Sequence, residues 1–412
     1  MAARPSPNRH DDAVRRMVIA LSGLLLMLGV DTLPGAGARA ATPVVRTVTG
    51  GGKVGGLRAP SGIAVDSSGD LFIADTDHCR ITMVAGQSRR AYGMPVRADH
   101  AYTLAGGTCG AKGGIGFPTG VAVDQSGDVF IADATGQRVL VVRSGGTNGP
   151  RPAVVVAGTG VAGYGGEGQL AGQSMLDQPT GIAVDATGDL FIADTGNCRL
   201  RMVPSANGVR FGRPMEAAHL YTVAGTGVCG SSDRGEPALS AQLDGPVAVA
   251  ADGLDDLFIA DEGDDEVLEV PGMSGMHYGE SIGAGDLAVI VGTGANGPYL
   301  IDGLPATGET AELNDPQGLA VSPAGTLFVA DGNMHCIRMV PSSSAVVFER
   351  SVNGGSMYTL AGALTVQNSS GGGNGTRWIL GHMDVPVGLA LSDNGDLYFS
   401  DRGLNQVRQI RP

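Results

Sequence analysis

The sequence predicts an all-β protein, a six-bladed β-propeller built from four-stranded antiparallel blades. A 25-residue phrase occurs six times in the 412-residue chain, without a gap in any copy and at intervals of 58 to 70 residues. Repeats of this length that are rich in short apolar runs are typical of propellers, where each blade buries its faces against its neighbours. The six repeat cores span residues 60–84, 118–142, 179–203, 246–270, 316–340 and 386–410.

Each copy contains a hairpin followed by a third strand. In the clearest copy, at 179–203, the runs IAVD and LFIAD flank the turn DATGD, and RLRMV follows. Short runs rich in Ile, Val and Phe on either side of such a turn predict two strands. A four-residue hairpin loop commonly needs positive φ at its last position. Five copies place glycine there, and the fourth copy has Asp255.

The fourth strand of each blade is predicted between the copies, at segments such as YTLAG (102–106) and VVVAG (154–158). The sixth copy is followed only by Arg411 and Pro412, which leaves the sixth blade without a fourth strand of its own. The segment VVRTVTG, from Val44 to Gly50, resembles the fourth strands and precedes the first copy. We expect it to pair into the last blade and close the ring, which leaves no open sheet edge there.

When the six copies are aligned, two positions besides the first proline are invariant. An alanine in the first strand is expected where the blades converge and space is short. An aspartate ends the second strand, where its carboxylate is expected to accept backbone N–H groups of the following turn. Six carboxylates in a ring resemble a metal site, but their recurrence in every copy favours a structural role. The aspartates are Asp75, Asp133, Asp194, Asp261, Asp331 and Asp401.

The pattern P-x-G-[IV]-A-V-D, then G-D-L-[FY]-I-A-D, then R-[IL]-R-M-V resembles that of NHL-repeat propellers, over residues 44–412. The connector GTGVAGYGGEGQLAGQSMLDQP at 158–179 resembles those of secreted actinobacterial members in particular. The resemblance implies a single propeller domain over residues 41–412. It implies no single function, since one scaffold supports both binding modules and enzymes.

Residues 1–40 are predicted to be an export signal. Arg15 and Arg16 precede the apolar stretch Met17–Val30, and Ala38 to Ala40 offer a small-x-small cleavage site. A 14-residue helix spans about 21 Å, short of the ~30 Å hydrocarbon core, so cleavage is favoured over a permanent anchor. We expect a secreted or extracytoplasmic protein without stable membrane insertion. The Sec route of export is favoured, and the twin-arginine route is the alternative because of Arg15 and Arg16.

The cysteines pair by their positions in the repeat. Cys79 and Cys198 share a column just before the third strand, and Cys109 and Cys229 follow a fourth strand 30 and 31 residues later. The start of the third strand lies beside the end of the fourth in an antiparallel pair, so each couple is within bonding reach. We predict the disulfides Cys79–Cys109 and Cys198–Cys229. Cys336 remains, and we expect a buried, inert thiol.

Charge and composition exclude some classes of partner. Removing the five Arg and three Asp of residues 1–40 leaves 22 basic and 38 acidic side chains, a formal charge of −16. With aromatic residues at 4% of the chain, nucleic acid is a poor partner. The acidic stretch 252–269 raises the hypothesis of calcium. It contains no D-x-[DN]-x-[DN]-G loop, so a solvated acidic face is favoured.

An enzyme is the main alternative, because six-bladed lactonases and amidating lyases hold metal ligands around the central channel. The first strands here, such as SGIAVD and TGVAVD, offer no polar ligand in mid-strand, and the histidines fall in different columns. No G-x-S-x-G motif occurs either. The sequence therefore predicts no catalytic, cofactor-binding or metal-binding residue.

Function is expected in the connectors that join one blade to the next, because they vary most and open on one face of the disk. We predict a secreted, monomeric, non-catalytic propeller that binds a protein or a small ligand. The alternatives are a metal-dependent hydrolase or lyase of the six-bladed type and a structural protein of the cell envelope.

Overall fold

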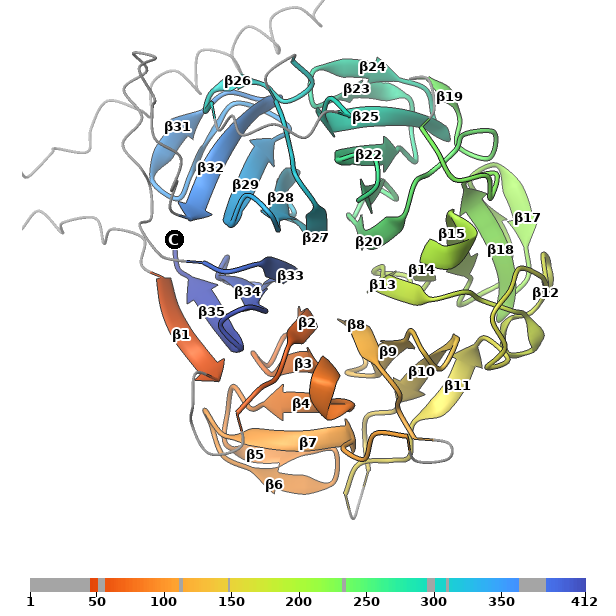
Figure 1. Cartoon of the computed structure of the whole chain (residues 1–412), viewed down its shortest axis with the longest axis vertical. Helices are drawn as coiled ribbons and strands as arrows, with labels where there is room; N and C mark the ends of the chain where they lie inside the picture. Colours follow the sequence, from red (N-terminus) through yellow and green to blue (C-terminus); the bar gives the residue numbers. More distant parts are fainter. Residues whose placement is uncertain are drawn as a thin grey trace, which may run out of the picture. The chain divides into compact units, whose positions relative to one another are not determined.

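The computed structural model describes residues 45–50, 56–110, 114–146, 149–231, 235–294, 301–308, 311–362 and 383–412. They form six antiparallel sheets arranged as a closed ring (Figure 1), which confirms the predicted all-β, six-bladed fold. Within these ranges the helices are three single turns: Thr76–His78, Ala171–Gln173 and Thr195–Asn197. None of the described helices is long and apolar enough to span a membrane. The predicted export signal at 1–40 lies outside the described residues.

Each blade runs outward from the centre in four strands. Blade 1 consists of β2 (Pro60–Val65), β3 (Leu71–Asp75), β4 (Arg80–Val84) and β7 (Ala101–Gly106). Blade 2 consists of β8 (Pro118–Val123), β9 (Val129–Asp133), β10 (Arg138–Val142) and β11 (Val154–Ala157). Blade 3 consists of β13 (Pro179–Val184), β14 (Leu190–Asp194), β15 (Arg199–Val203) and β18 (His219–Ala224).

Blade 4 consists of β20 (Pro246–Ala251), β21 (Leu257–Asp261), β22 (Glu266–Val270) and β25 (Asp286–Gly292). Blade 5 consists of β27 (Pro316–Val321), β28 (Thr326–Asp331), β29 (Cys336–Pro341) and β32 (Ser356–Gly362). Blade 6 contributes β33 (Pro386–Leu391), β34 (Leu397–Asp401) and β35 (Gln406–Ile410), and its outer strand is β1 (Val45–Gly50).

The N-terminal strand closes the ring, as the sequence predicts. Strand β1 pairs antiparallel with β35, so that Val45 lies opposite Ile410 and Gly50 opposite Gln406. The first and last parts of the described chain thus share one sheet (Figure 1). Blade 6 gains its fourth strand from the other end of the sequence, and its third strand is no longer an open edge.

An apolar side chain three residues before each first strand anchors the connector to the blades. The six side chains are all at most 7% exposed, and they are Leu57, Ile115, Leu176, Leu243, Leu313 and Met383. Each removes its apolar surface from water and so holds the end of a long connector at a fixed place. The hairpin turns also agree with the sequence: φ is +75° to +86° at the five glycines and +65° at Asp255.

The structure adds short strands to the four that the sequence predicts in each blade. Blades 1, 3, 4 and 5 carry outer hairpins, namely β5 (Arg89–Ala91) with β6 (Met94–Val96), β16 (Gly208–Arg210) with β17 (Arg213–Met215), β23 (Gly275–His277) with β24 (Glu280–Ile282), and β30 (Ala345–Val347) with β31 (Arg350–Val352). Blades 3, 4 and 5 gain a fifth strand of two residues from the preceding connector, namely β12 (Gln169–Leu170), β19 (Glu236–Pro237) and β26 (Leu304–Pro305). The fifth strands pair with the outer strands of blades 3, 4 and 5 and so cover part of those edges.

The invariant aspartates are structural, but their partner differs from the predicted one. Each carboxylate accepts the N–H of the residue two positions before the first proline of its own blade, at 2.7 to 3.1 Å. The expected bond to the following turn exists in two copies, from Gly136 to Asp133 at 3.2 Å and from Leu404 to Asp401 at 3.4 Å. The carboxylate therefore ties the incoming connector to the blade.

Another repeat position, just before the third strand, links each blade to the next. Its six residues all have φ between +48° and +54°. We call them the latch residues: Cys79, Gln137, Cys198, Asp265, His335 and Asn405. In blades 2, 4, 5 and 6 the latch side chain accepts the N–H of the residue just before the next blade's first proline. Asn405 thus accepts from Ala59 at 2.7 Å, across the closure of the ring.

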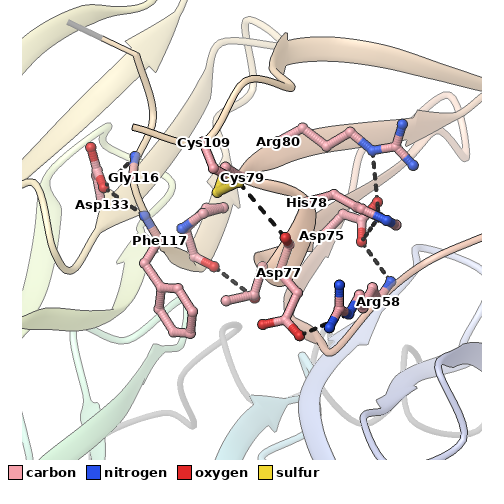
Figure 2. Close-up of a disulfide and its surroundings, with 12 residues drawn as sticks. Arg58, Asp75, Asp77, His78, Cys79, Arg80, Cys109, Gly116, Phe117 and Asp133 are labelled. Atoms are coloured by element: carbon pink, nitrogen blue, oxygen red, sulfur yellow. Dashed lines mark hydrogen bonds and ion pairs between the residues drawn. A yellow bond between two sulfur atoms is a disulfide. The ribbon is translucent and has the colours of Figure 1, made fainter. Parts of the chain in front are cut away.

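In blades 1 and 3 a disulfide takes the place of this hydrogen bond. Cys79 is bonded to Cys109 and Cys198 to Cys229, the two pairs that the repeats predict. Figure 2 shows the first disulfide together with Asp75 and its partners Arg58, His78 and Arg80. Every blade thus has a side chain in the same column that holds the connector leading to the next blade.

The fifth cysteine is Cys336, in β29. Its side chain is buried and it forms no disulfide. Burial raises the pKa of the Cys336 thiol, and the Asp331 carboxylate raises it further. The thiolate is disfavoured in this environment, which agrees with the expected inert thiol.

Candidate ligand site at the channel mouth

A cavity of about 410 Å³ lies where the six first strands converge. Its walls come from β2, β8, β13, β20, β27 and β33 (Figure 1). Most of the strand residues that line it are Gly, Ala, Val, Ile or Leu. This part of the wall is apolar, so the few polar groups decide what the cavity can bind.

Three hydroxyl side chains of the wall are engaged within the scaffold. Thr119 donates to the carbonyl of Thr180 at 3.1 Å, and Thr180 donates to the carbonyl of Val247 at 2.9 Å. The hydroxyl of Ser61 is 2.8 Å from that of Thr76. The two threonines bond to the next blade, so these groups serve the packing of the ring before they serve a ligand.

Four other polar side chains line the cavity from three adjacent blades; we call Glu262, Asp315, Gln317 and Arg402 the mouth cluster. Glu262 follows β21 in blade 4, and Arg402 follows β34 in blade 6. Asp315 immediately precedes β27 in blade 5, and Gln317 lies within that strand. The cluster therefore occupies one half of the mouth.

Glu262 and Asp315 form a coupled pair of carboxyl groups. Burial, the Asp315 charge and a hydrogen bond to Asp315 raise the pKa of Glu262 to about 7, against a smaller opposing effect of the Gln317 hydrogen bond. The amide of Gln317 donates to Oδ1 of Asp315. Burial and a neighbouring carboxylate disfavour the ionised form of a carboxyl group, so near neutral pH Glu262 keeps its proton for part of the time.

The backbone fixes Asp315 in place. Its N–H donates to Oδ1 of the latch residue Asp265 at 2.7 Å, and its carbonyl accepts from the N–H of Gly332 at 2.9 Å. Its φ of +66° lies in the left-handed region, which aspartate tolerates better than most residues. The site is thus held by the same connections that hold the blades together.

The mouth cluster was not predicted from the sequence, where the ligands of an enzyme would be expected in the middle of the first strands. Glu262 and Arg402 instead come one residue after the invariant aspartate. The other copies have small residues there: Thr76, Ala134, Thr195 and Gly332. A charged residue in that column of small residues was the available signal. The predicted disulfide residues Cys79, Cys109, Cys198 and Cys229 do not line the cavity.

Comparison with known proteins supports the repeat assignment. The NHL repeat model matches residues 57–82, 116–142, 176–201 and 313–338, in blades 1, 2, 3 and 5. The protein SUPPRESSOR OF QUENCHING 1, chloroplastic, from Arabidopsis thaliana is 27% identical over 150 residues. That match covers 35% of this chain and only 14% of the plant protein.

Solved propellers share the fold at low identity. An auxiliary nutrient binding protein from Bacteroides ovatus is 15% identical, with a TM-score of 0.54 over 90% of this chain and 77% of that one. A structural genomics protein of unknown function from Bacteroides thetaiotaomicron is 14% identical, with a TM-score of 0.54 over 89% and 75%. A gluconolactonase from Xanthomonas campestris is 12% identical, with a TM-score of 0.50 over 92% and 95%. At these identities the likeness shows the fold alone.

Proposed function

We propose that this propeller, which contains NHL repeats, is a non-catalytic binding protein that works outside the cytoplasm as a monomer. Its ligand is a small zwitterion, such as an amino acid or a short peptide, which binds at the channel mouth. The carboxyl pair Glu262–Asp315 in the central cavity carries this proposal.

The chemistry of the mouth cluster supports a ligand with both charges. An ammonium group that enters the cavity displaces the proton held by Glu262 and Asp315 and receives charge-assisted hydrogen bonds. Arg402 has an exposed side chain on the cavity wall and supplies the positive charge for the ligand's carboxylate. A volume of about 410 Å³ suits a ligand of this size.

The two disulfides support the proposed place of action. Bonds such as Cys79–Cys109 and Cys198–Cys229 persist in oxidising compartments and are rare in the cytosol. An export signal at residues 1–40, with features of secreted actinobacterial NHL-repeat proteins in the connectors, agrees with this location. The fold itself does not decide between functions, since a nutrient binding protein and a gluconolactonase both share it.

A hydrolase or lyase is the second candidate, and the same pair favours it. A carboxyl group with a pKa of about 7, such as Glu262, suits general acid–base catalysis at neutral pH. Turnover of lactones or peptides that is lost in Glu262→Gln would favour this alternative over simple binding.

Calorimetric titration with amino acids and dipeptides at pH 6 and pH 8 tests the proposal. Below the pKa of the pair, affinity falls by up to about tenfold per pH unit, because the ligand must displace a proton. Binding is therefore expected to be tighter at pH 8. Glu262→Thr and Arg402→Ala, which introduce residues found at this column in other blades, are each expected to weaken it by about tenfold or more.

Glu216→Gln is the matched control, because the Glu216 side chain is 72% exposed and lies outside the cavity lining. It is expected to bind as the unaltered protein does. Equal affinity in Glu262→Thr would move the ligand site to the connectors and contradict the proposal. Failure of every zwitterion to bind would favour a protein partner or a structural role in the cell envelope.

A further inference from the structure

A second group of titratable side chains lies in blade 4, on residues that do not line the channel cavity. Asp256 directly precedes β21, Glu269 lies in β22, and His277 ends β23 of the outer hairpin. Two strands of the blade and the hairpin thus bring three ligand-type residues together. One potential ligand atom from each residue lies within 4.8 Å of the other two.

Hydrogen-bond partners of both ring nitrogens fix the orientation of the His277 imidazole. Nε2 is 3.1 Å from the carbonyl oxygen of Met273, and since a carbonyl can only accept, Nε2 carries a proton. Nδ1 faces the carboxylates, 2.8 Å from Oε1 of Glu269 and 3.6 Å from Oδ2 of Asp256. A carbonyl that fixes the far nitrogen in this way is the usual support of a metal-binding histidine.

In each blade, one residue of the third strand lies opposite an aromatic residue of the second strand, and in blade 4 this residue is Glu269. The equivalent residues of the other blades are mostly apolar: Met83, Val141, Met202, Met339 and Gln409. The Glu269 side chain is nevertheless 0% exposed, and among the described residues its Oε2 has no hydrogen-bond partner. A carboxylate oxygen buried without a partner is costly, which points to a ligand that the protein atoms do not supply.

Among the described residues, Asp256 forms no ion pair with an arginine, in contrast to the equivalent aspartates of blades 1, 2 and 3. The residues equivalent to Asp256 in blades 1, 2 and 3 each pair with an arginine: Asp70 with Arg89, Asp128 with Arg143, and Asp189 with Arg210. In blade 4 the imidazole of His277 stands where Arg210 stands in blade 3, and it faces two carboxylates. When both carboxyl groups are ionised, the three side chains carry an excess of negative charge even with a protonated imidazole.

We propose that Asp256, Glu269 and His277 bind a first-row divalent metal ion, with Zn²⁺ as the ion that fits best. The ligands are Nδ1 of His277, a carboxylate oxygen of Glu269 and Oδ2 of Asp256. The ion replaces the proton that lies between Nδ1 and Oε1 and supplies the charge that arginine supplies in the other blades.

The donor set decides the class of ion. One imidazole nitrogen and two carboxylates suit zinc, whereas Ca²⁺ and Mg²⁺ prefer sites built from oxygen alone. The Oδ1 of Asp256 already accepts the N–H of Gly272 at 2.8 Å, so Oδ2 remains for the ion. Zinc bound here joins β22 to the hairpin of β23 and β24 and stabilises the outer part of blade 4.

Metal analysis of the protein made from the full chain, without a histidine tag, tests this site. After removal of metal by a chelator and reloading, one zinc ion per chain is expected. Zinc at 100 times its dissociation constant is expected to raise the midpoint of thermal unfolding by roughly 5 °C. Ca²⁺ and Mg²⁺ at the same concentration are expected to leave the midpoint unchanged.

Two variants locate the ion. Glu269→Met introduces the residue of blades 1, 3 and 5 and is expected to stay folded while it loses the bound zinc and the thermal shift. His277→Arg gives Asp256 the partner that Asp189 has and is expected to do the same. His219→Gln, which alters a histidine of blade 3, is the control and is expected to keep the zinc.

Two results would overturn the proposal. One is a reloaded protein that holds no stoichiometric zinc. The other is zinc that remains bound, with its thermal shift, in a folded Glu269→Met variant, because the ion would then lie elsewhere.

Discussion

Asp261 differs from the other invariant aspartates because no arginine follows it. In every other copy an arginine stands five or seven residues later, and it pairs with the aspartate in blades 1, 2, 3 and 6. Blade 4 has Glu266 and Leu268 at those positions. Burial and the charges of Asp264, Asp244 and Glu266 raise the pKa of Asp261 to about 8, against the hydrogen bond from Asp244.

The raised pKa predicts a stability that falls as pH rises. An unfolded aspartate ionises near pH 4, but folded Asp261 keeps its proton up to about pH 8. Across that window folding requires uptake of a proton, so the free energy of unfolding decreases with pH and levels off above about pH 8. Asp261→Asn removes this dependence. From pH 5 to pH 8, the free energy of unfolding of the variant is expected to rise by at least about 1 kcal/mol relative to that of the unaltered protein.

Urea unfolding at pH 5, 6, 7 and 8 measures this difference. Asp133→Asn is the control, because Asp133 pairs with Arg138, and it is expected to destabilise the protein at every pH. A constant difference between Asp261→Asn and the unaltered protein across the range would contradict the assignment.

At the scale of the elements, the latch residues explain why the connectors can vary in length. Each connector is held at its end by a buried apolar side chain and by the invariant aspartate. A latch side chain or a disulfide from the preceding blade holds it as well. The segments between these points are free to differ. The disulfides are thus one version of a connection that the other blades make with Gln, Asp, His or Asn.

The latch predicts a specific effect at Asn405. Asn405→Gly keeps the left-handed backbone but removes the acceptor for the N–H of Ala59, and it is expected to lower the free energy of unfolding by about 1 to 2 kcal/mol. Asn405→Asp keeps an acceptor, as Asp265 does in blade 4, and is expected to stay within about 0.5 kcal/mol. Denaturant unfolding of both variants checks this, and equal losses would show that the hydrogen bond contributes nothing.

At the scale of the whole molecule, stability depends on closure of the ring. Strand β1 is separated from β35 by more than 350 residues of sequence, as the bond between Thr47 and Gln406 illustrates, with a separation of 359. Contacts this distant in sequence carry a high loop-closure entropy and are slow to form. The last blade is therefore complete only when the first strand joins it.

Removal of the first strand is expected to open the ring. A protein that begins at residue 51 exposes the edge of β35 and is expected to unfold at a lower temperature and to self-associate in size-exclusion chromatography. A synthetic peptide of residues 42–52 is expected to restore the monomer by adding a strand to that edge. A protein that begins at residue 42 is the control, and equal melting temperatures of the two proteins would refute the role of β1.

The repeats made most of the fold predictable. An internal alignment of six copies identified the strands, the turns, the closing strand and both disulfide pairs, because these features recur or are absent together. The outer hairpins and fifth strands were harder to predict, since they lie in inserts that differ between blades. The latch hydrogen bonds were missed because Gln137, Asp265, His335 and Asn405 have no residue type in common.

The sequence by itself determined the architecture of this protein, because every blade uses the same pattern of strands, turns and buried apolar residues, and this pattern recurs in the six copies. Only the tertiary structure decided which residues meet. Glu262, Asp315 and Arg402 come from three blades, and Asp256, Glu269 and His277 come from two strands and a hairpin. The aligned repeats mark some of these residues as unusual, but their spacing along the chain does not show that they meet, since the distances between them are set by how neighbouring blades and strands pack.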